Sequence, residues 1–555
     1  MPEPVSASHE IHAQPAPEVE YRQVRRVEGF NTIRAEYPGY LSDESKLVSS
    51  SADLLFFPKD EAELAAVIRE MSERQVPMTI AGARTGLVGG SVPARGAVVS
   101  MEHFDQVESI HYDESSSEWR VVAQTSVSLK SMGAMLSVKN FPTLEKAVDP
   151  GLKSQYECFK AEKTGYFYPP DPTETSATLG GSVVTNASGA RTYRFGPTRN
   201  WVRAIRVFLA NGEYLDISRG RYTADQQGQF VVHTTSGEAI KLTIPDYTLP
   251  RTKCAAGFFT EPGMDLIDLF IGSEGVLGVV TQVEVALMRE EAKLSMVQFV
   301  NSDEEAVQLT DHLRAENGLK LDFLEFYSAN ALELLRKVQQ EAPSSVGMPF
   351  LPEGKVSAVF FELSYDPHGD HQPLELLREL LTDCGADPAH SWVAYEPREL
   401  ERFKVFRHLL PETVNAIIAE RKKGIPGLYK LGTDLAVPDK YLADLWHLYQ
   451  TTCDGLGLEW VAFGHIGNNH IHVNILPRNI QEQQAGLSAY ENFARQAVAW
   501  GGSVSAEHGI GKIKQKFLHL MFSEDQLAQM KRVKDALDPD GLFNPGDIFP
   551  DEVAG

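Results

Sequence analysis

Glycine and proline crowd one stretch of the chain, residues 166–201 (YFYPPDPTETSATLGGSVVTNASGARTYRFGPTRNW). Prolines flank Asp171, and Gly180, Gly181 and Gly189 follow with few bulky residues between them. A chain uses glycine this densely where its backbone must lie against a ligand or take a positive φ. Backbone N–H groups in such a loop suit a pyrophosphate, but a Gly/Pro surface loop has the same composition. The stretch alone leaves both interpretations open.

Two further segments have a similar character. In the first of these, residues 76–101, residues 76–80 read as a short strand and a glycine loop follows. A helix signal precedes this strand, because Asp60 and Glu63 are spaced as in a capping box. Residues 269–287 (LFIGSEGVLGVVTQVEVAL) carry three glycines within an apolar run that resumes as a strand. Neither segment is a GxGxxG loop that opens a helix, so the usual dinucleotide signature is absent.

Together the three segments resemble the FAD-binding domain of the vanillyl-alcohol oxidase/p-cresol methylhydroxylase (PCMH) family, over about residues 50–290. The resemblance implies a two-subdomain, PCMH-type FAD-binding domain within an α+β protein. It places the following residues at the cofactor: Gly82, Ala83, Arg84, Thr85, Gly86, Leu87, Pro170, Asp171, Thr178, Gly180, Gly181, Ser188, Gly189 and Val280.

Two features of these segments bear on how FAD is held. Arg84 stands where the family usually has a small residue or glycine, and it could pair with the diphosphate or point to solvent. Relatives that bind FAD covalently use a histidine or cysteine near these loops. Residues 76–101 contain neither residue type, so we expect non-covalent FAD.

Length and composition limit the classes of protein that this chain can be. Its 555 residues suffice for two or three domains, and 43% hydrophobic and 23% charged residues are typical of soluble proteins. A net charge of −24 disfavours nucleic acid and anionic membranes, and an acidic substrate would need a locally positive site. The four cysteines match no metal or CxxC spacing, which is typical of reduced thiols in a cytosolic protein.

The sequence shows no membrane-targeting pattern. The first 20 residues lack the basic-then-apolar order of a signal peptide. The most apolar stretch, residues 266–288, contains three acidic residues and is not a spanning segment. We expect a cytoplasmic protein without a transmembrane segment, which could lie at the periphery of the inner membrane.

From about residue 290, strand-like and helix-like segments alternate. The expected strands are LSMVQFV, KLDFLEFY and VSAVFFELSY, and the expected helices span residues 303–316, 328–340 and 373–384. This alternation suits an α+β sheet layered with helices. We therefore expect four regions: an N-terminal extension (1–49) with a disordered start, the FAD-binding domain (50–290), a ferredoxin-like α+β substrate or cap domain (291–500), and a C-terminal segment that completes the active site (501–555).

Histidines and a glutamate gather in two short segments of the C-terminal half. Residues 463–476 read FGHIGNNHIHVNIL, and residues 501–512 read GGSVSAEHGIGK. The candidates are His465, His470, His472, Glu507 and His508. Two histidines and one carboxylate with an open position make a divalent-metal site. A single strand histidine is more often a structural residue, so the expectation rests on the set.

With these segments, the C-terminal half resembles the D-2-hydroxyacid dehydrogenase branch of the family, which includes D-lactate, glycolate and D-2-hydroxyglutarate dehydrogenases. Its GH-small-GDGN-x-H and GG-xxx-EHG motifs imply that His465, His472 and Glu507 hold a divalent metal, zinc by first choice, and that His508 is the base. Here residues 468–470 (NNH) replace Asp-Gly-Asn, which questions the loop conformation but not the ligands.

The same resemblance suggests how substrate and flavin are contacted. Asn474 falls on a substrate-contacting asparagine, and Asn544 lies in a closing segment that usually approaches the flavin. Arg407 and Lys430 read alone as solvated charges, but the resemblance places both at the substrate carboxylate. Pro411 stands where glutarate-oxidising relatives can have a threonine, which argues against a dicarboxylate substrate.

The sequence therefore predicts an FAD-dependent dehydrogenase of a small D-2-hydroxy acid such as D-lactate. We expect a cytochrome, a quinone or an electron-transfer flavoprotein as electron acceptor, and a homodimer as the assembly. Two enzyme alternatives are a D-2-hydroxyglutarate or glycolate dehydrogenase and an FAD transferase of the alkylglycerone-phosphate synthase type, which carries a histidine run in place of residues 506–508 (AEH). The third alternative, a flavin-binding subunit without chemistry, would typically lose the metal ligands.

Overall fold

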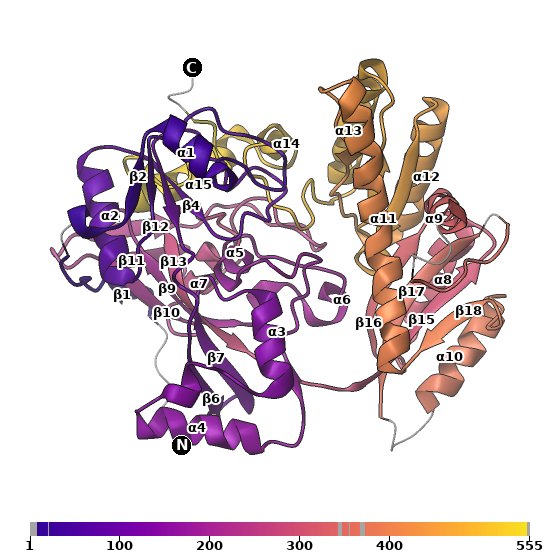
Figure 1. Cartoon of the computed structure of the whole chain (residues 1–555), viewed down its shortest axis with the longest axis horizontal. Coiled ribbons are helices and arrows are strands. Elements are labelled where there is room, and N and C mark those ends of the chain that lie inside the picture. Colours follow the sequence, from indigo (N-terminus) through magenta and orange to yellow (C-terminus); the bar gives the residue numbers. More distant parts are fainter. Residues whose placement is uncertain (1–7, 20, 342–346, 355, 367–371, 552–555) are drawn as a thin grey trace.

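The computed structural model describes residues 8–19, 21–341, 347–354, 356–366 and 372–551. The chain start that was expected to be disordered, residues 1–7, lies outside this part. Helices and several separate sheets make up the described chain, which confirms the α+β class. Figure 1 shows two halves side by side, an N-terminal half in indigo to magenta and a second half mainly in orange.

A four-stranded sheet in the N-terminal half carries the glycine loop of the 76–101 segment, called the first glycine loop below. Its order is β2 (Arg26–Glu28), β3 (Leu54–Phe56), β5 (Ala97–Ser100) and β4 (Met78–Ala81). Helix α2 (Glu61–Glu73) precedes β4 as predicted, and the Asp60 side chain accepts from the backbone N–H of Glu63. The residues at helical spacing are buried, and they are Leu64, Val67, Ile68 and Met71.

A five-stranded sheet forms the rest of the N-terminal core. Its order is β10 (Tyr214–Ser218), β9 (Val202–Phe208), β13 (Val279–Ala286), β7 (Glu118–Gln124) and β6 (Val107–Asp113). Smaller sheets comprise β1 (Glu10–His12) with β11 (Gln229–His233) and β12 (Ala239–Thr243), and β14 (Met288–Arg289) with β8 (Tyr166–Phe167). The helices are α1 (Phe30–Glu36), α3 (Leu129–Val138), α4 (Pro150–Ala161), α5 (Leu179–Val184), α6 (Thr192–Phe195) and α7 (Leu266–Phe270).

The second half is built on a seven-stranded sheet. Its order is β18 (Ser391–Ala394), β15 (Ala292–Val300), β17 (Ser357–Tyr365), β16 (Leu321–Tyr327), β20 (Trp460–Gly464), β21 (His472–Ile475) and β19 (Leu431–Gly432). The first four strands have the order of a ferredoxin-like unit. Its helices are α8 (Asp303–Ala315), α9 (Ala329–Glu341), α10 (Gln372–Asp383), α11 (Pro397–Gly424), α12 (Leu442–Gly455) and α13 (Ile480–Ala499). The three strands and three helices predicted from residue 290 onward are thus confirmed.

The end of the chain returns to the N-terminal half. Helices α14 (Gln515–Met521) and α15 (Glu524–Leu537), yellow in Figure 1, lie on that side of the molecule. The backbone N–H of Met78 on β4 donates to Leu542, and that of Asn544 donates back to Met78. This pairing brings the last segment of the chain beside the first glycine loop. The four domain boundaries themselves stay a prediction.

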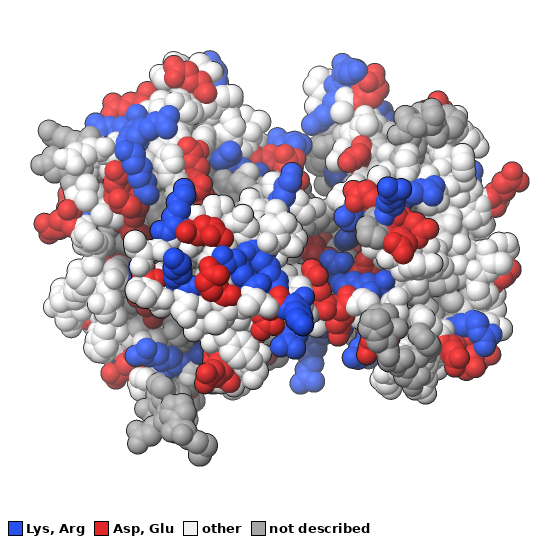
Figure 2. All heavy atoms as spheres, turned by 60° about the horizontal axis from the view of Figure 1, so that its bottom comes forward, with Lys and Arg blue, Asp and Glu red and all other residues white. Residues whose placement is uncertain are grey.

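Ion pairs connect the two halves. Arg191 pairs with Glu362 at 2.7 Å, and Arg194 of α6 pairs with Asp322 of β16 at 2.5 Å. On the face shown in Figure 2, Lys and Arg side chains gather with acidic ones where the halves meet. None of the helices in the described part of the chain is both long and apolar enough to cross a lipid bilayer.

Candidate active site

A cavity of about 530 Å³ lies where the glycine loops of the N-terminal half meet the second half. Every residue predicted to contact FAD lines this cavity except Pro170, Asp171 and Gly189. The same cavity is lined by Lys430, Glu507 and His508 from the C-terminal half. The cofactor residues and part of the predicted chemistry therefore share one continuous space.

The first glycine loop offers hydrogen-bond donors to this cavity. Within the described residues, no backbone N–H of residues 83–87 donates to a protein acceptor. Unpaired backbone N–H groups in a glycine-rich loop suit a pyrophosphate, so this wall fits the diphosphate of FAD. Arg84 has a φ of +59°, a conformation that favours glycine. Its guanidinium lies over the Tyr40 ring, 4.2 Å from the centroid, and donates to the carbonyl of Gly82.

Two glycines of the 166–201 segment allow neighbouring parts of the protein to pack closely. A Cβ at Gly180 would meet Thr125 Oγ1 at 1.4 Å, and a Cβ at Gly189 would meet the carbonyl oxygen of Asp171 at 2.0 Å. Asp171 faces this packing layer, where its side chain accepts from the backbone N–H of Arg191. These positions shape the wall behind the cavity surface.

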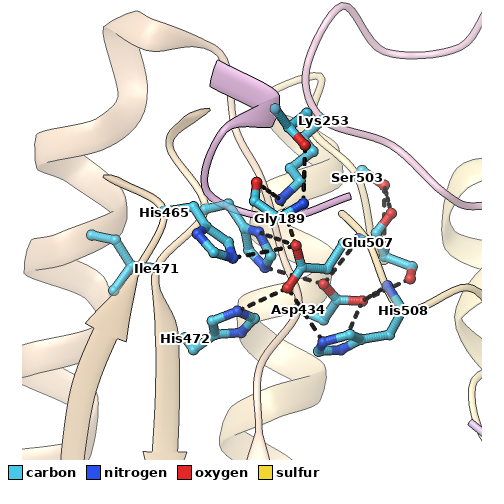
Figure 3. A network of polar contacts seen from close by, with 12 residues as sticks. Gly189, Lys253, Asp434, His465, Ile471, His472, Ser503, Glu507 and His508 are labelled. Carbon is cyan, nitrogen blue, oxygen red and sulfur yellow. Dashed lines mark hydrogen bonds and ion pairs between the residues drawn. The ribbon is translucent and has the colours of Figure 1, made fainter. Parts of the chain in front are cut away.

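Three histidines converge on Glu507, which is the member of this group that lines the cavity. His465 and His470 flank the short turn between β20 and β21, His472 begins β21, and Glu507 comes from the loop between α13 and α14. One ligand atom of each residue lies within 4.8 Å of the others. The Nε2 atoms of His465 and His472 lie 3.3 and 3.2 Å from the two carboxylate oxygens of Glu507 (Figure 3). Imidazole nitrogens and a carboxylate at this spacing are a suitable donor set for a divalent transition metal.

Each of the two predicted ligand histidines is oriented through its other ring nitrogen. Nδ1 of His465 lies 2.8 Å from Glu325, and Nδ1 of His472 lies 2.9 Å from the carbonyl oxygen of Thr433. Partners of this kind fix the ring so that Nε2 faces the metal position. Burial opposes the charge on Glu325, but Arg407 and His465 lower its pKa to about 2.

Asp434 holds the loop that carries Glu507 and His508. Its carboxylate accepts the backbone N–H groups of both residues, at 3.2 and 3.1 Å. It also lies 3.4 Å from Nδ1 of His508, and it pairs with Lys514. Burial would raise its pKa, but His508 and Lys514 hold the pKa well below its usual range. An ionised Asp434 therefore orients His508 with Nε2 directed away from it, 3.4 Å from Glu507.

Lys253 connects the group of three histidines and Glu507 to the glycine-rich segments predicted to hold FAD. Its Nζ lies 2.5 Å from Oε2 of Glu507 and donates to the carbonyl oxygen of Gly189 at 3.3 Å (Figure 3). Burial opposes ionisation of Glu507, but Lys253 and His465 hold its pKa well below the usual range. Glu507 is therefore an ionised, negatively charged donor.

The two predicted carboxylate-binding cations have different surroundings. Arg407 of α11 does not line the cavity, and it pairs with Glu325 at 3.3 Å. Lys430 lines the cavity and makes no hydrogen bond or ion pair with any described residue. Burial and the nearby Lys46 lower its pKa. Asn474 of β21 is buried, and its side-chain N–H₂ group has no partner among the described residues.

Sequence reasoning assigned no role to Glu325, Asp434 or Lys253. Glu325 lies in KLDFLEFY, where two acidic residues interrupt an apolar strand that is buried throughout. A carboxylate in such a strand costs free energy unless it is paired, and that signal could have identified it. Asp434 carried no comparable signal, because an aspartate in a turn-like segment is common.

Comparisons with known families and curated proteins agree with this geometry. The family described as FAD linked oxidases, C-terminal domain, matches residues 289–548, and the family described as FAD binding domain matches residues 52–150 and 147–218. Glycolate oxidase subunit GlcD of Bacillus subtilis is 25% identical over 95% of both chains. D-lactate dehydrogenase of Anaerostipes hadrus is 26% identical over 88% of this chain and 87% of its own. D-2-hydroxyglutarate dehydrogenase of Stutzerimonas stutzeri is 25% identical over 92% and 94%.

A solved structure shares the fold. An alkyldihydroxyacetonephosphate synthase superimposes with a TM-score of 0.57 at 14% identity, over 96% of this chain and 88% of the synthase. At that identity the likeness shows the fold alone. The two families together cover both halves of the molecule, and the chain therefore belongs to the FAD-linked oxidases, flavoproteins with a PCMH-type FAD-binding domain.

Proposed function

We propose that this protein is an FAD-dependent dehydrogenase that oxidises a small D-2-hydroxy acid, D-lactate or a close analogue, to the 2-oxo acid. The observation that carries the proposal is the convergence of His465 and His472 on Glu507, which lines the FAD-type cavity together with His508. The named relatives, which are D-lactate, glycolate and D-2-hydroxyglutarate enzymes, support the same substrate class.

Two bound groups would supply the chemistry that the side chains lack. The residues that line the cavity would hold FAD non-covalently as the hydride acceptor, and His465, His472 and Glu507 would hold a divalent ion that could polarise the substrate hydroxyl. Zinc fits two histidines and one carboxylate with an open position, and manganese or iron are the alternatives.

The protein's own side chains then divide the remaining work. His508, oriented by Asp434 through Nδ1, takes the hydroxyl proton on Nε2. Lys430 neutralises the substrate carboxylate within a chain of net charge −24. The unpaired amide of Asn474 donates to a substrate oxygen.

The cavity wall beyond C2 favours a short monocarboxylate. Pro411 of α11 lines this wall and has neither a hydroxyl nor an N–H to offer a second carboxylate. Its neighbour Glu412 also lines the cavity, and its charge would repel a second carboxylate. We therefore rank D-lactate above D-2-hydroxyglutarate.

A substrate screen tests the proposal. The purified protein is supplied with D and L forms of 2-hydroxy acids of increasing length and with an artificial dye as electron acceptor. We expect D-lactate or a neighbouring short acid to reduce the dye fastest, with the L forms poor. Dye reduction by none of the acids would reject the proposal and favour the transferase or subunit alternatives. Three points stay predictions. They are the natural electron acceptor, which we expect to be a cytochrome, a quinone or an electron-transfer flavoprotein, the cytoplasmic location and the homodimer.

A further inference from the structure

His470 is the member of the histidine cluster that the family motif does not contain. It stands where the resembled motif has asparagine, and its side chain is fully buried. Its Nε2 lies beside Asp434, but its Nδ1 makes no hydrogen bond to a described residue. A buried nitrogen without a partner costs free energy, so the site is expected to give Nδ1 one.

The orientation of His470 matches that of the two predicted ligand histidines. Its Nε2 lies 3.1 Å from Oδ1 of Asp434, and its Nδ1 faces Oε2 of Glu507 at 3.9 Å. His465 and His472 likewise place one nitrogen beside an oxygen acceptor and direct the other toward Glu507. A carboxylate behind one nitrogen and a free second nitrogen is the usual arrangement of a metal-bound histidine.

The surroundings of His470 also hold it in place. Its ring centroid lies 4.2 Å from that of His472 and 5.4 Å from that of His465, so the three rings enclose one small volume. Asn469, just before it, has a φ of +53° and binds Arg314 and Asp439 outside the cluster. These contacts fix the turn that directs His470 inward.

We propose that His470 is a fourth protein ligand of the divalent ion, so that the site comprises three imidazoles and one carboxylate. The proposal rests on the proposed function and refines the ligand set beyond His465, His472 and Glu507. It assigns Asp434 two roles, because one oxygen then orients the ligand His470 and the other orients the base His508.

Four protein ligands change which ion suits the site. A 2-hydroxy acid that binds through its hydroxyl and one carboxylate oxygen needs two further positions, which makes six. Zinc is almost always four-coordinate in closed protein sites and expands to five in some transition states. Ions that readily take six ligands, such as Mn²⁺, Fe²⁺ or Co²⁺, therefore suit this chain better than Zn²⁺.

Metal affinity of the FAD-loaded protein tests the inference. The metal is removed by dialysis against a chelator, and Mn²⁺ and Zn²⁺ are titrated back in competition with a chromophoric chelator. His470→Asn, which restores the residue of the family motif, should weaken Mn²⁺ binding by at least roughly 10–100-fold, the cost usually seen even for residues that only orient a ligand. Asn468→Ala is the matched control, since Asn468 lies in the same turn and its side-chain oxygen has no hydrogen-bond partner among the described residues.

A second measurement uses the unaltered protein, so it does not depend on how the variant folds. X-ray absorption at the edge of the bound metal counts imidazole ligands through their characteristic multiple scattering. Three imidazoles support the proposal and two overturn it. An unchanged Mn²⁺ affinity in His470→Asn, with FAD retained, would also overturn it.

The two hypotheses fail in different ways. The metal-dependent part of the proposed function is rejected if the unaltered protein binds no stoichiometric metal, or if His465→Ala binds metal as well as the unaltered protein does. If the unaltered protein binds one metal per chain and His465→Ala loses it while His470→Asn does not, only the fourth ligand is rejected.

Discussion

Lys430 offers the sharpest single substitution in this site. It lies just before β19, lines the cavity with Glu507 and His508, and has no ionic partner among the described residues. Its pKa is lowered by burial and by Lys46, so the charged form is held at a cost while no substrate is bound. A substrate carboxylate would supply the missing partner. Lys430→Met keeps the length of the side chain and removes only the charge.

The expected loss follows from removing one partner of a partly buried charge pair. Such truncations cost about 2–5 kcal/mol. Lys430 keeps some contact with solvent, so the lower part of that range applies. About 2–3 kcal/mol corresponds to a fall of roughly 30- to 160-fold in kcat/KM, because each 1.36 kcal/mol is tenfold. The substrate-free protein should become more stable, since a partly buried charge without a partner among the described residues is removed.

Two assays on Lys430→Met test the expected fall in kcat/KM and the expected gain in stability. Steady-state kinetics with D-lactate and a dye acceptor give kcat/KM, and denaturant unfolding without substrate gives stability. Lys423→Met is the control, because Lys423 is exposed on the surface and, among the described residues, pairs with Glu420 alone. A normal kcat/KM in Lys430→Met would remove Lys430 from carboxylate binding. A loss of stability in the substrate-free variant would mean that Lys430 has a partner that the structure does not show.

Three further predictions concern the base, a buried acid and the flavin. His508→Ala should slow flavin reduction by roughly 10²–10⁴-fold with FAD retained, because a general base is lost, and single-turnover absorbance measures it. Burial raises the pKa of Asp547 to about 8, despite Lys512 beside it. The folded state thus holds a proton that the unfolded chain releases near pH 4, so stability should fall as pH rises from about 4 to 8, by up to ~1.4 kcal/mol per pH unit. Asp547→Asn should flatten that slope in urea unfolding; an unchanged slope would contradict the shifted pKa. Acid precipitation should release the flavin, and colour retained in the pellet would refute non-covalent binding.

Much of the fold could be predicted because its signals are local. The apolar strands from residue 290 onward and the helices between them follow from periodicity and length. The capped start of α2 follows from Asp60, whose side chain accepts the Glu63 N–H as the spacing implies. Strand pairing between distant segments is not local, so the contact of Asn544 with β4 was not predicted, and only its approach to the flavin was expected from the family resemblance.

The site was less predictable, because its pairings join residues far apart in sequence. Arg407 was expected at the substrate carboxylate, but in the structure its nearest anion is Glu325, on a strand more than 80 residues earlier. No sequence pattern links these two residues. Motif spacing did bring His465 and His472 together, since both flank one short turn. The same turn carries His470, whose role depends on Asp434 from another loop.

One measurement tests the central claim most directly. The FAD-loaded protein is mixed with D-lactate without oxygen or acceptor, before and after chelation of divalent metal, and the flavin absorbance is followed. The account predicts rapid bleaching by D-lactate, little by L-lactate, and loss of bleaching after chelation while FAD stays bound. Restoring the metal should restore bleaching. Failure of every short D-2-hydroxy acid to bleach the flavin, or bleaching that is indifferent to chelation, would contradict the account.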